Sequence, residues 1–268
     1  MRWIVRVGAT LSLVFLIMPT IVATVLSFTT SNVPTLPLPG YSLYWYKQLR
    51  GDSIIVESIF TAMSVAVFSS VIATFLGWLG AYHEYRRTVA YPDWGILLAF
   101  VPCLLPQSVS GFALQRYLSL LHVPKGMMAV IIAHAALASP LTFFVLRAAY
   151  KQTSPHLQSA AHNLGAVRWS AIARLVVRSS VPSLLAACAM SFVLSWSESV
   201  VAWYVSGMHP TLATEIRVKI SGACTPEVFA AGFVSIIAIL VNLLAFMAAS
   251  RLIGHSSSSL WKSRRQAL

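Results

Sequence analysis

Long apolar stretches alternate with short polar segments along the whole chain. A helix needs about 20 mostly apolar residues to cross the hydrocarbon core of a bilayer. The stretches that qualify are 4–28, 54–82, 94–121, 127–148, 183–205 and 228–253. No internal repeat or linker separates them. The pattern predicts an all-α membrane protein with six transmembrane helices in a single transmembrane domain, residues 1–268.

The composition excludes a water-soluble domain. Charged residues make up 10% of the chain and hydrophobic residues 57%, whereas a soluble domain carries about 25% charged residues. Cys103, Cys188 and Cys224 are far apart and form no C-x-x-C pair. The cysteines therefore predict neither a metal site nor a disulfide framework.

The formal charge of +12 has a membrane explanation, because Lys and Arg collect in the cytoplasmic loops of membrane proteins. Thirteen of the 19 Lys and Arg residues lie in the N-terminal tail, in 83–93, in 147–182 and in the C-terminal tail, which six spans would place on one side of the membrane. Five lie in the segments expected on the other side. This asymmetry predicts a multi-pass protein of the inner (cytoplasmic) membrane with both termini in the cytoplasm. We expect lipid as its surroundings and no nucleic acid partner.

Proline and aromatic residues mark two further segments. The stretch "PCLLPQSVSG" from Pro102 to Gly111 predicts an irregular or kinked helix inside the third span. The outer segment 29–49 is rich in proline and aromatic residues. Its aromatic side chains are expected to dock at the membrane interface, and they are Tyr41, Tyr44, Trp45 and Tyr46.

The segment 149–182, between the fourth and fifth spans, is too polar to cross the lipid. Pro155 is suited to start a short helix, and Gly165 is suited to end it. A narrow apolar stripe recurs at helical spacing between them, at Leu157, Ala160, Ala161 and Leu164. The two alanines would let another surface approach closely.

A second, amphipathic helix is predicted after Gly165. Its cationic face carries Arg168, Arg174 and Arg178, and Pro182 is expected to turn the chain into the fifth span. Two interpretations follow from these residues alone. The segment is either an ordinary interfacial helix or a docking element for a partner.

The stretch "LQSAAHNLGAVRWSAIARLVVRSSVP" resembles the loop of ABC importer permeases that carries the pattern E-A-A-x-x-x-G. Ala160, Ala161 and Gly165 match, but Ser159 stands in place of the glutamate. The stretches "PCLLPQSVSG", "AHAALASPLTFFVL", "SFVLSWSESVVAWYVSG" and "TPEVFAAG" are similar, in the same order, to motifs of one subfamily. That subfamily is the second permease of spermidine/putrescine transport systems.

The resemblance implies the type I ABC importer permease (MetI-like) fold, with a cytoplasmic coupling helix between spans four and five. It also implies three kinds of partner: a dimer of ABC ATPases, a second permease subunit and a periplasmic solute-binding protein. The chain would form half of the translocation path for a small polar solute, such as a polyamine or another amine. It contains no G-x-x-x-x-G-K-[ST] motif, so ATP would bind to the partner ATPase. No catalytic, cofactor or metal residues are therefore expected in the chain itself.

Glu198 is the only acid placed well inside a predicted span. A charge there costs about 2.5–3.5 kcal/mol on insertion scales, so it normally faces a cavity or a partner. It would either attract an amine solute or bond to the second permease. The candidate path residues are Gln107, Ser195, Trp196, Ser197 and Glu198. Because Gln107 and Ser197 stand where the subfamily has acids, a monoamine, a zwitterion or a neutral solute fits nearly as well as a polyamine.

Two other classes of protein remain as alternatives. A stand-alone secondary transporter often shows an inverted repeat, which is not evident here. An intramembrane hydrolase would need a nucleophile and a base, for which His134 and the serines near Ser195 are the candidates. No H-E-x-x-H motif for a zinc site is present.

Overall fold

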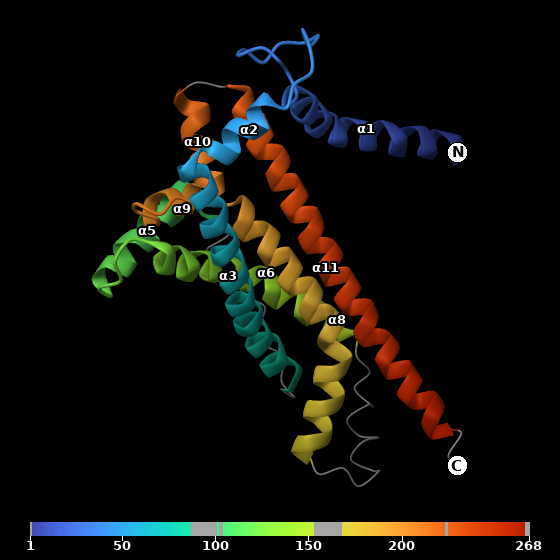
Figure 1. The fold of residues 1–268 in the computed structure, drawn as a ribbon. Coiled ribbons are helices and arrows are strands. Elements are labelled where there is room, and N and C mark those ends of the chain that lie inside the picture. Colours follow the sequence, from blue (N-terminus) through green and yellow to red (C-terminus); the bar gives the residue numbers. More distant parts are fainter. Residues whose placement is uncertain (1, 87–100, 102–103, 153–167, 223–224, 266–268) are drawn as a thin grey trace.

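The computed structural model describes residues 2–86, 101, 104–152, 168–222 and 225–265 (Figure 1). Helices dominate these ranges. They are α1 (Arg2–Leu26), α2 (Tyr44–Gly51), α3 (Ser53–Arg86), α5 (Gln107–Leu120), α6 (Met127–Lys151), α8 (Arg168–Ser197), α9 (Val200–Val205), α10 (Leu212–Gly222) and α11 (Pro226–Arg265).

Five of these helices, α1, α3, α6, α8 and α11, are long and apolar enough to cross a membrane. They coincide with five of the six predicted spans. The third predicted span, 94–121, is represented by α5, which has 14 residues and begins directly after Pro106. Most of the preceding stretch lies outside the described residues, so the sixth span stays a prediction.

The fifth span differs from the prediction at both of its ends. Helix α8 runs without interruption from Arg168 through Pro182 to Ser197, so the predicted turn at Pro182 is wrong. A proline removes one backbone hydrogen bond but need not end a helix whose neighbours pack well. The helix then stops before Glu198, and α9 continues from Val200. The single predicted helix 183–205 is therefore two helices.

The centre of the molecule is the close packing of α3 against α6. A Cβ atom at Gly77 would lie 2.6 Å from the backbone nitrogen of Phe143 and would also collide with Thr142. The Thr142 hydroxyl donates a hydrogen bond of 2.7 Å to the carbonyl oxygen of Ala73, across the same interface. Glycine at this position lets the two backbones approach, which is typical of helix pairs in membranes.

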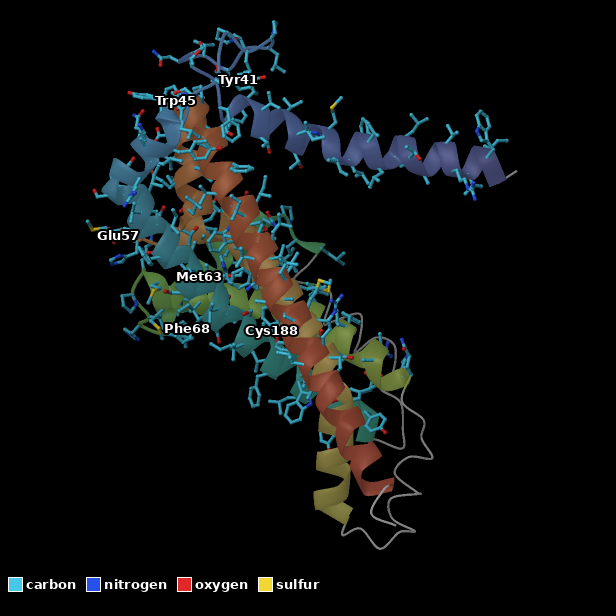
Figure 2. The ribbon with its side chains drawn as sticks, turned by 45° about the vertical axis from the view of Figure 1, so that its right-hand side comes forward. Tyr41, Trp45, Glu57, Met63, Phe68 and Cys188 are labelled. Atoms are coloured by element: carbon cyan, nitrogen blue, oxygen red, sulfur yellow. The ribbon has the colours of Figure 1, made fainter. Side chains whose placement is uncertain are left out.

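Two short helices that the hydrophobic pattern did not predict, α2 and α10, close the end of the molecule where α3 begins (Figure 1). The predicted orientation places this end outside the cytoplasm, and we call it the outer end. Trp45 of α2 is buried, and its indole Nε1 donates to the carbonyl oxygen of Thr29 at 2.9 Å. The expectation that Trp45 docks at the membrane interface is therefore wrong, because its ring belongs to the protein core. Tyr41 and Tyr44 do point outward, with 81% and 57% of their surface exposed. Tyr41 and Trp45 lie at this end of the molecule in Figure 2.

Helix α1 stands away from the other helices (Figure 1). Only 6% of its apolar stretch is buried within the chain, and side chains project from it into open space along its length (Figure 2). Its main packing partner is α11. The helix therefore exposes an apolar surface that lipid or another subunit has to cover.

Candidate solute path and coupling region

The predicted coupling residues lie outside the described part of the chain. They are Leu157, Ala160, Ala161, Leu164 and Gly165. What is described is where the flanking helices end: α6 stops at Lys151 and α8 begins at Arg168. The coupling helix and its position consequently stay predictions.

An ion pair joins the C-terminal ends of α3 and α6. The Arg147 Nε atom donates to both carboxylate oxygens of Glu84, at 2.8 and 2.7 Å. Both side chains are mostly buried, with 21% and 14% of their surfaces exposed. A charged pair of this geometry holds two helix ends in one relative position more firmly than an exposed pair would.

Glu198 is turned onto the backbone of its own chain. Its Oε1 atom accepts hydrogen bonds from the amides of Val200 at 2.7 Å and Val201 at 2.9 Å. These are the first amides of α9, which have no partner within the helix. The carboxylate is thus an N-terminal cap for α9, and it is 7% exposed. This contact explains both the break after α8 and the acid at this depth.

Ser195 belongs to a buried hydrogen-bond chain between three helices. Its Oγ atom accepts from the Ser69 hydroxyl of α3 at 2.8 Å and lies 2.9 Å from Nδ1 of His134 on α6. The predicted pairing of His134 with Ser195 is therefore present as a contact. Ser195 is 3% exposed and His134 0%, so no substrate reaches the hydroxyl in this conformation. The contact ties α3, α6 and α8 together, and its burial does not favour the hydrolase interpretation.

Trp196 and Ser197 line a hollow of about 410 Å³ between the outer ends of α8, α10 and α11. Trp196 is itself 3% exposed and stacks on Phe192 with ring centroids 5.9 Å apart. The hollow also takes in Ser199, Ser235 and Arg217, which the sequence analysis did not select. The fifth candidate, Gln107, is exposed at the start of α5 and is not among the residues lining this hollow.

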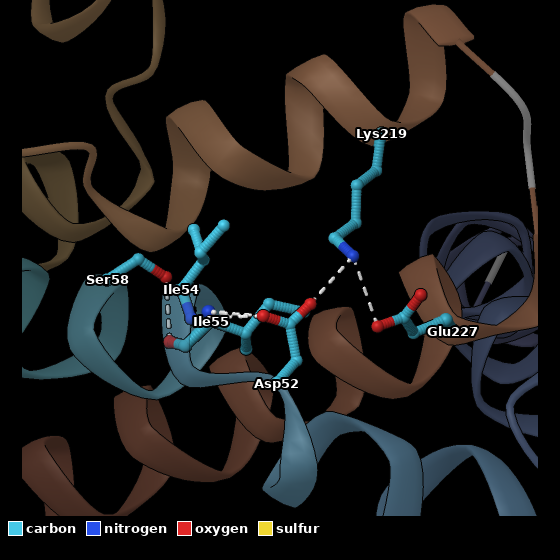
Figure 3. A network of polar contacts seen from close by, with 6 residues as sticks. All are labelled: Asp52, Ile54, Ile55, Ser58, Lys219 and Glu227. Carbon is cyan, nitrogen blue, oxygen red and sulfur yellow. Dashed lines mark hydrogen bonds and ion pairs between the residues drawn. The ribbon is translucent and has the colours of Figure 1, made fainter. Parts of the chain in front are cut away.

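A three-residue ion-pair network, which we call the outer clasp, holds α10 in place (Figure 3). Lys219 Nζ lies 3.1 Å from Oδ2 of Asp52 and 3.2 Å from Oε1 of Glu227. The second carboxylate oxygen of Asp52 caps α3 by accepting from the amides of Ile54 and Ile55. The clasp joins the starts of α3 and α11 to α10 beside the hollow.

The clasp also shifts the titration of its members. Burial alone would raise the pKa of Asp52, yet hydrogen bonds from Lys219 and from the α3 amides, together with the Lys219 charge, lower it below the usual 3.8. Burial alone would lower the pKa of Lys219, yet its bonds to Asp52 and Glu227 raise it above the usual 10.5. Both shifts favour the charged forms that make the clasp.

The outer clasp was missed by sequence reasoning because Asp52 is 167 positions away from Lys219, and Glu227, eight positions after Lys219, belongs to another helix. The one local signal was Asp52 directly before an apolar run, a typical helix cap. Among the described residues, no group of three His, Cys, Asp or Glu side chains is placed to hold a metal ion.

The chain is similar to known transport subunits over most of its length. It is 25% identical to the spermidine/putrescine transport system permease protein PotC of Escherichia coli K12. This alignment of 232 residues covers 86% of this chain and 88% of PotC. The chain is 22% identical over 212 residues to the putrescine transport system permease protein PotI of the same strain, over 75% of this chain and 74% of that protein. The chain is a homologue of ABC importer permeases. No protein-family model matches it.

Solved structures show that this permease homologue has the importer fold. A bacterial ABC transporter for the acidic polysaccharide alginate aligns over 94% of this chain and 96% of its own, with a TM-score of 0.66 and 15% identity. A bacterial alginate ABC transporter in complex with an alginate pentasaccharide-bound periplasmic protein aligns with a TM-score of 0.66, at 16% identity, over 94% of this chain and 95% of its own. The fold implied by the resemblance is thereby confirmed as a mainly helical fold shared with solved importer permeases, while the six spans and the coupling helix stay predictions.

Proposed function

We propose that this permease is one half of the membrane path of an ATP-driven, binding-protein-dependent importer for a small polar solute. The single observation that carries the proposal is the match to PotC across 86% of the chain. The five long apolar helices and the alginate-importer fold support it. The amine solutes named for PotC and PotI make a polyamine or another amine the first solute to test.

The partners follow from the same proposal. An ABC ATPase dimer binds and hydrolyses ATP on the cytoplasmic side, because the chain has no phosphate-binding motif of its own. A second permease subunit completes the path, and a periplasmic solute-binding protein delivers the solute. The alginate transporter, which was solved with its periplasmic protein, supports the last of these partners.

For the path itself, we assign Trp196 and Ser197 to the wall of the outer hollow and Glu198 to the cap of α9. Arg217, Ser199 and Ser235 complete the polar part of that wall. No acid is among the residues lining this hollow. If the solute is an amine, the carboxylates that attract it therefore belong to the second permease or to another part of the path.

The decisive experiment is uptake by the assembled importer. The chain is expressed with its neighbouring ATPase, second permease and solute-binding protein, purified in detergent and placed in proteoliposomes. We expect the ATPase to co-purify, and uptake of radiolabelled putrescine or spermidine to stop when the phosphate-binding lysine of the ATPase is replaced. Uptake that survives this replacement would point instead to a stand-alone secondary transporter.

The coupling segment has its own test. Gly165→Val introduces a β-branched residue where a left-handed helix end is predicted, and ATP hydrolysis should then continue while uptake falls at least about tenfold. Gly8→Val is the matched control, because Gly8 in α1 has nothing within 4 Å of an added Cβ. Full uptake by the Gly165→Val importer would remove the coupling role from this glycine.

A further inference from the structure

The break between α8 and α9 shapes the wall of the outer hollow. Helix α8 ends at Ser197, and α9 begins at Val200. Ser197 on one side of the break and Ser199 inside it both line the hollow. The positions of these two residues therefore depend on how the end of α8 is held relative to α9.

Helix α6 holds both sides of this break. On the α8 side, Nδ1 of His134 lies 2.9 Å from the hydroxyl oxygen of Ser195, two residues before the end of α8. On the α9 side, Val130 and Ala133 of α6 belong to the same buried apolar cluster as Val201, and the two helices pack together. About one turn of α6 thus fixes the end of α8 by a polar contact and α9 by apolar packing.

The polar contact is shielded from solvent, because His134 is 0% exposed and Ser195 is 3% exposed. Ser195 accepts a hydrogen bond of 2.8 Å from the Ser69 hydroxyl of α3. Its own hydroxyl hydrogen is then left to donate to the imidazole. Hydrogen bonds in an interior of low dielectric constant are stronger than in water, so this chain fixes the end of α8 more firmly than an exposed contact would.

The second ring nitrogen of His134 shows that stability alone does not explain a histidine here. Nε2 is buried and has no hydrogen-bond partner among the described residues. A buried polar atom without a partner costs free energy, and an apolar side chain of similar size would avoid this cost. His134→Leu should therefore leave folding nearly unchanged and remove only the contact with Ser195, which keeps its bond to Ser69.

We infer that His134 is a positioning residue for solute transport: through Ser195 it holds the end of α8, and with it Ser197 and the wall of the outer hollow, in one place relative to α9. This inference rests on the proposed function, because it needs the hollow to lie on the solute path. The imidazole itself does not touch the solute in this role, because it is fully buried. Its loss should move Ser197 without unfolding the protein.

The reactivity of a thiol at position 197 tests this movement without any uptake. Ser197→Cys is introduced into a chain whose three native cysteines are replaced by serine, and its reaction with a water-soluble maleimide is timed in the purified importer complex. We expect His134→Leu to raise this rate at least about threefold, because the end of α8 is less restrained. The rate at Ser221→Cys, an exposed position on α10, should not change.

His134→Asn is the matched control for both assays, because its amide oxygen can accept from Ser195 in place of Nδ1. It should restore the wild-type labelling rate at position 197. A rate in His134→Leu that equals or falls below the wild-type rate would overturn the inference. So would a rate that rises equally at positions 197 and 221, since this would indicate general loosening.

Uptake tests the consequence for transport. Proteoliposomes contain the permease with its ATPase and second permease, and an excess of the putrescine-loaded binding protein is supplied. His134→Leu should import labelled putrescine at least about threefold more slowly than wild type, whereas His134→Asn should stay within about twofold. The melting temperatures of all three should agree. Wild-type uptake by His134→Leu would overturn the role in transport.

Ser195→Ala tests whether His134 acts through Ser195. The double variant with His134→Leu should be no slower in uptake than the slower of the two single variants. Additive losses would overturn the link through Ser195. A wild-type complex without ATP-dependent uptake would instead overturn the proposed function and the role of His134 in transport, while the labelling rates would still show whether His134 holds the end of α8.

Discussion

At the scale of single residues, Glu198 shows why a membrane-embedded acid need not touch the solute. The sequence located the acid correctly and allowed two uses for it, a solute contact or a bond to a partner subunit. The structure shows a third use, a cap on the free amides of α9. The sequence could not reveal this use, because apolar residues lie on both sides of "SWSES" and the whole of 183–205 is apolar enough to be predicted as one span.

Replacing Glu198 separates the cap from a solute contact. Glu198→Gln keeps an acceptor oxygen for α9, so we expect uptake to stay within about twofold of wild type and the melting temperature to fall only slightly. Glu198→Ala removes the acceptor and should cost about 1 kcal/mol or more, as the loss of a helix cap does. Melting by scanning fluorimetry and uptake assays check both variants. A large loss of uptake in Glu198→Gln alone would show that the charge contacts the solute.

The sequence analysis selected Ser195 and Trp196 as path residues because of their positions near Glu198. In the structure, their contacts give both residues a packing role instead. Ser195 is hydrogen-bonded to Ser69, and Trp196 packs in the core. Ser197 alone combines exposure with a place on the outer hollow. One helical turn contains all three, so their different surroundings depend on tertiary packing that a single sequence does not display.

At the scale of elements, the pairing of α3 with α6 depends on the small side chains at their interface. Gly77→Ala places a methyl group against the backbone of Phe143, and overpacking of this kind costs about 1–3 kcal/mol. We expect a lower melting temperature in detergent for this variant. Gly8→Ala should be neutral, since nothing lies near Gly8. Equal stability of the two variants would contradict the close approach.

The outer clasp makes a prediction for α10. Lys219→Met removes both ion pairs and leaves two carboxylates facing each other, so hydrogen exchange of the α10 amides should accelerate about tenfold or more. Arg217→Met is the control on the same helix, because Arg217 makes no ion pair with the described side chains. If exchange in α10 is the same in both variants, the clasp does not hold the helix.

The clasp also predicts a pH dependence. The pKa of Asp52 is lowered, so its contribution is present above 3.8 and is lost as the pH falls through its folded value. The pKa of Lys219 is raised, so its contribution is present below 10.5 and is lost as the pH rises through its folded value. The difference in melting temperature between wild type and Lys219→Met should be constant from about pH 5 to 9 and should shrink below pH 3.8. A constant difference down to pH 2 would contradict this.

At the scale of the whole molecule, apolar length alone was enough to predict five helices. The signal is strong because every backbone amide within the hydrocarbon has to be bonded internally, which a long helix achieves. Helices α2 and α10 were missed for the opposite reason. They are short, they carry charges such as Lys47 and Lys219, and they lie at the outer end, where hydropathy carries no helical signal.

The distribution of Lys and Arg predicts the orientation of the whole molecule, and reporter fusions measure it. A fluorescent protein fused after residue 268 should fluoresce, and alkaline phosphatase at the same place should be inactive, because both termini are expected in the cytoplasm. Phosphatase fused at residue 222, at the end of α10, should be active. The reverse pattern would invert the assignment of the inner and outer ends.

The packing of α1 against α11 has a consequence for how the protein is made. Helix α1 leaves the ribosome before its main partner, α11, which begins about 200 residues later in the chain. At a synthesis rate of roughly 5–20 residues per second, α1 spends about 10–40 s in the bilayer before that partner exists. During this time α1 depends on lipid or on the insertion machinery to shield its apolar surface, so its own packing is completed only at a late step of synthesis.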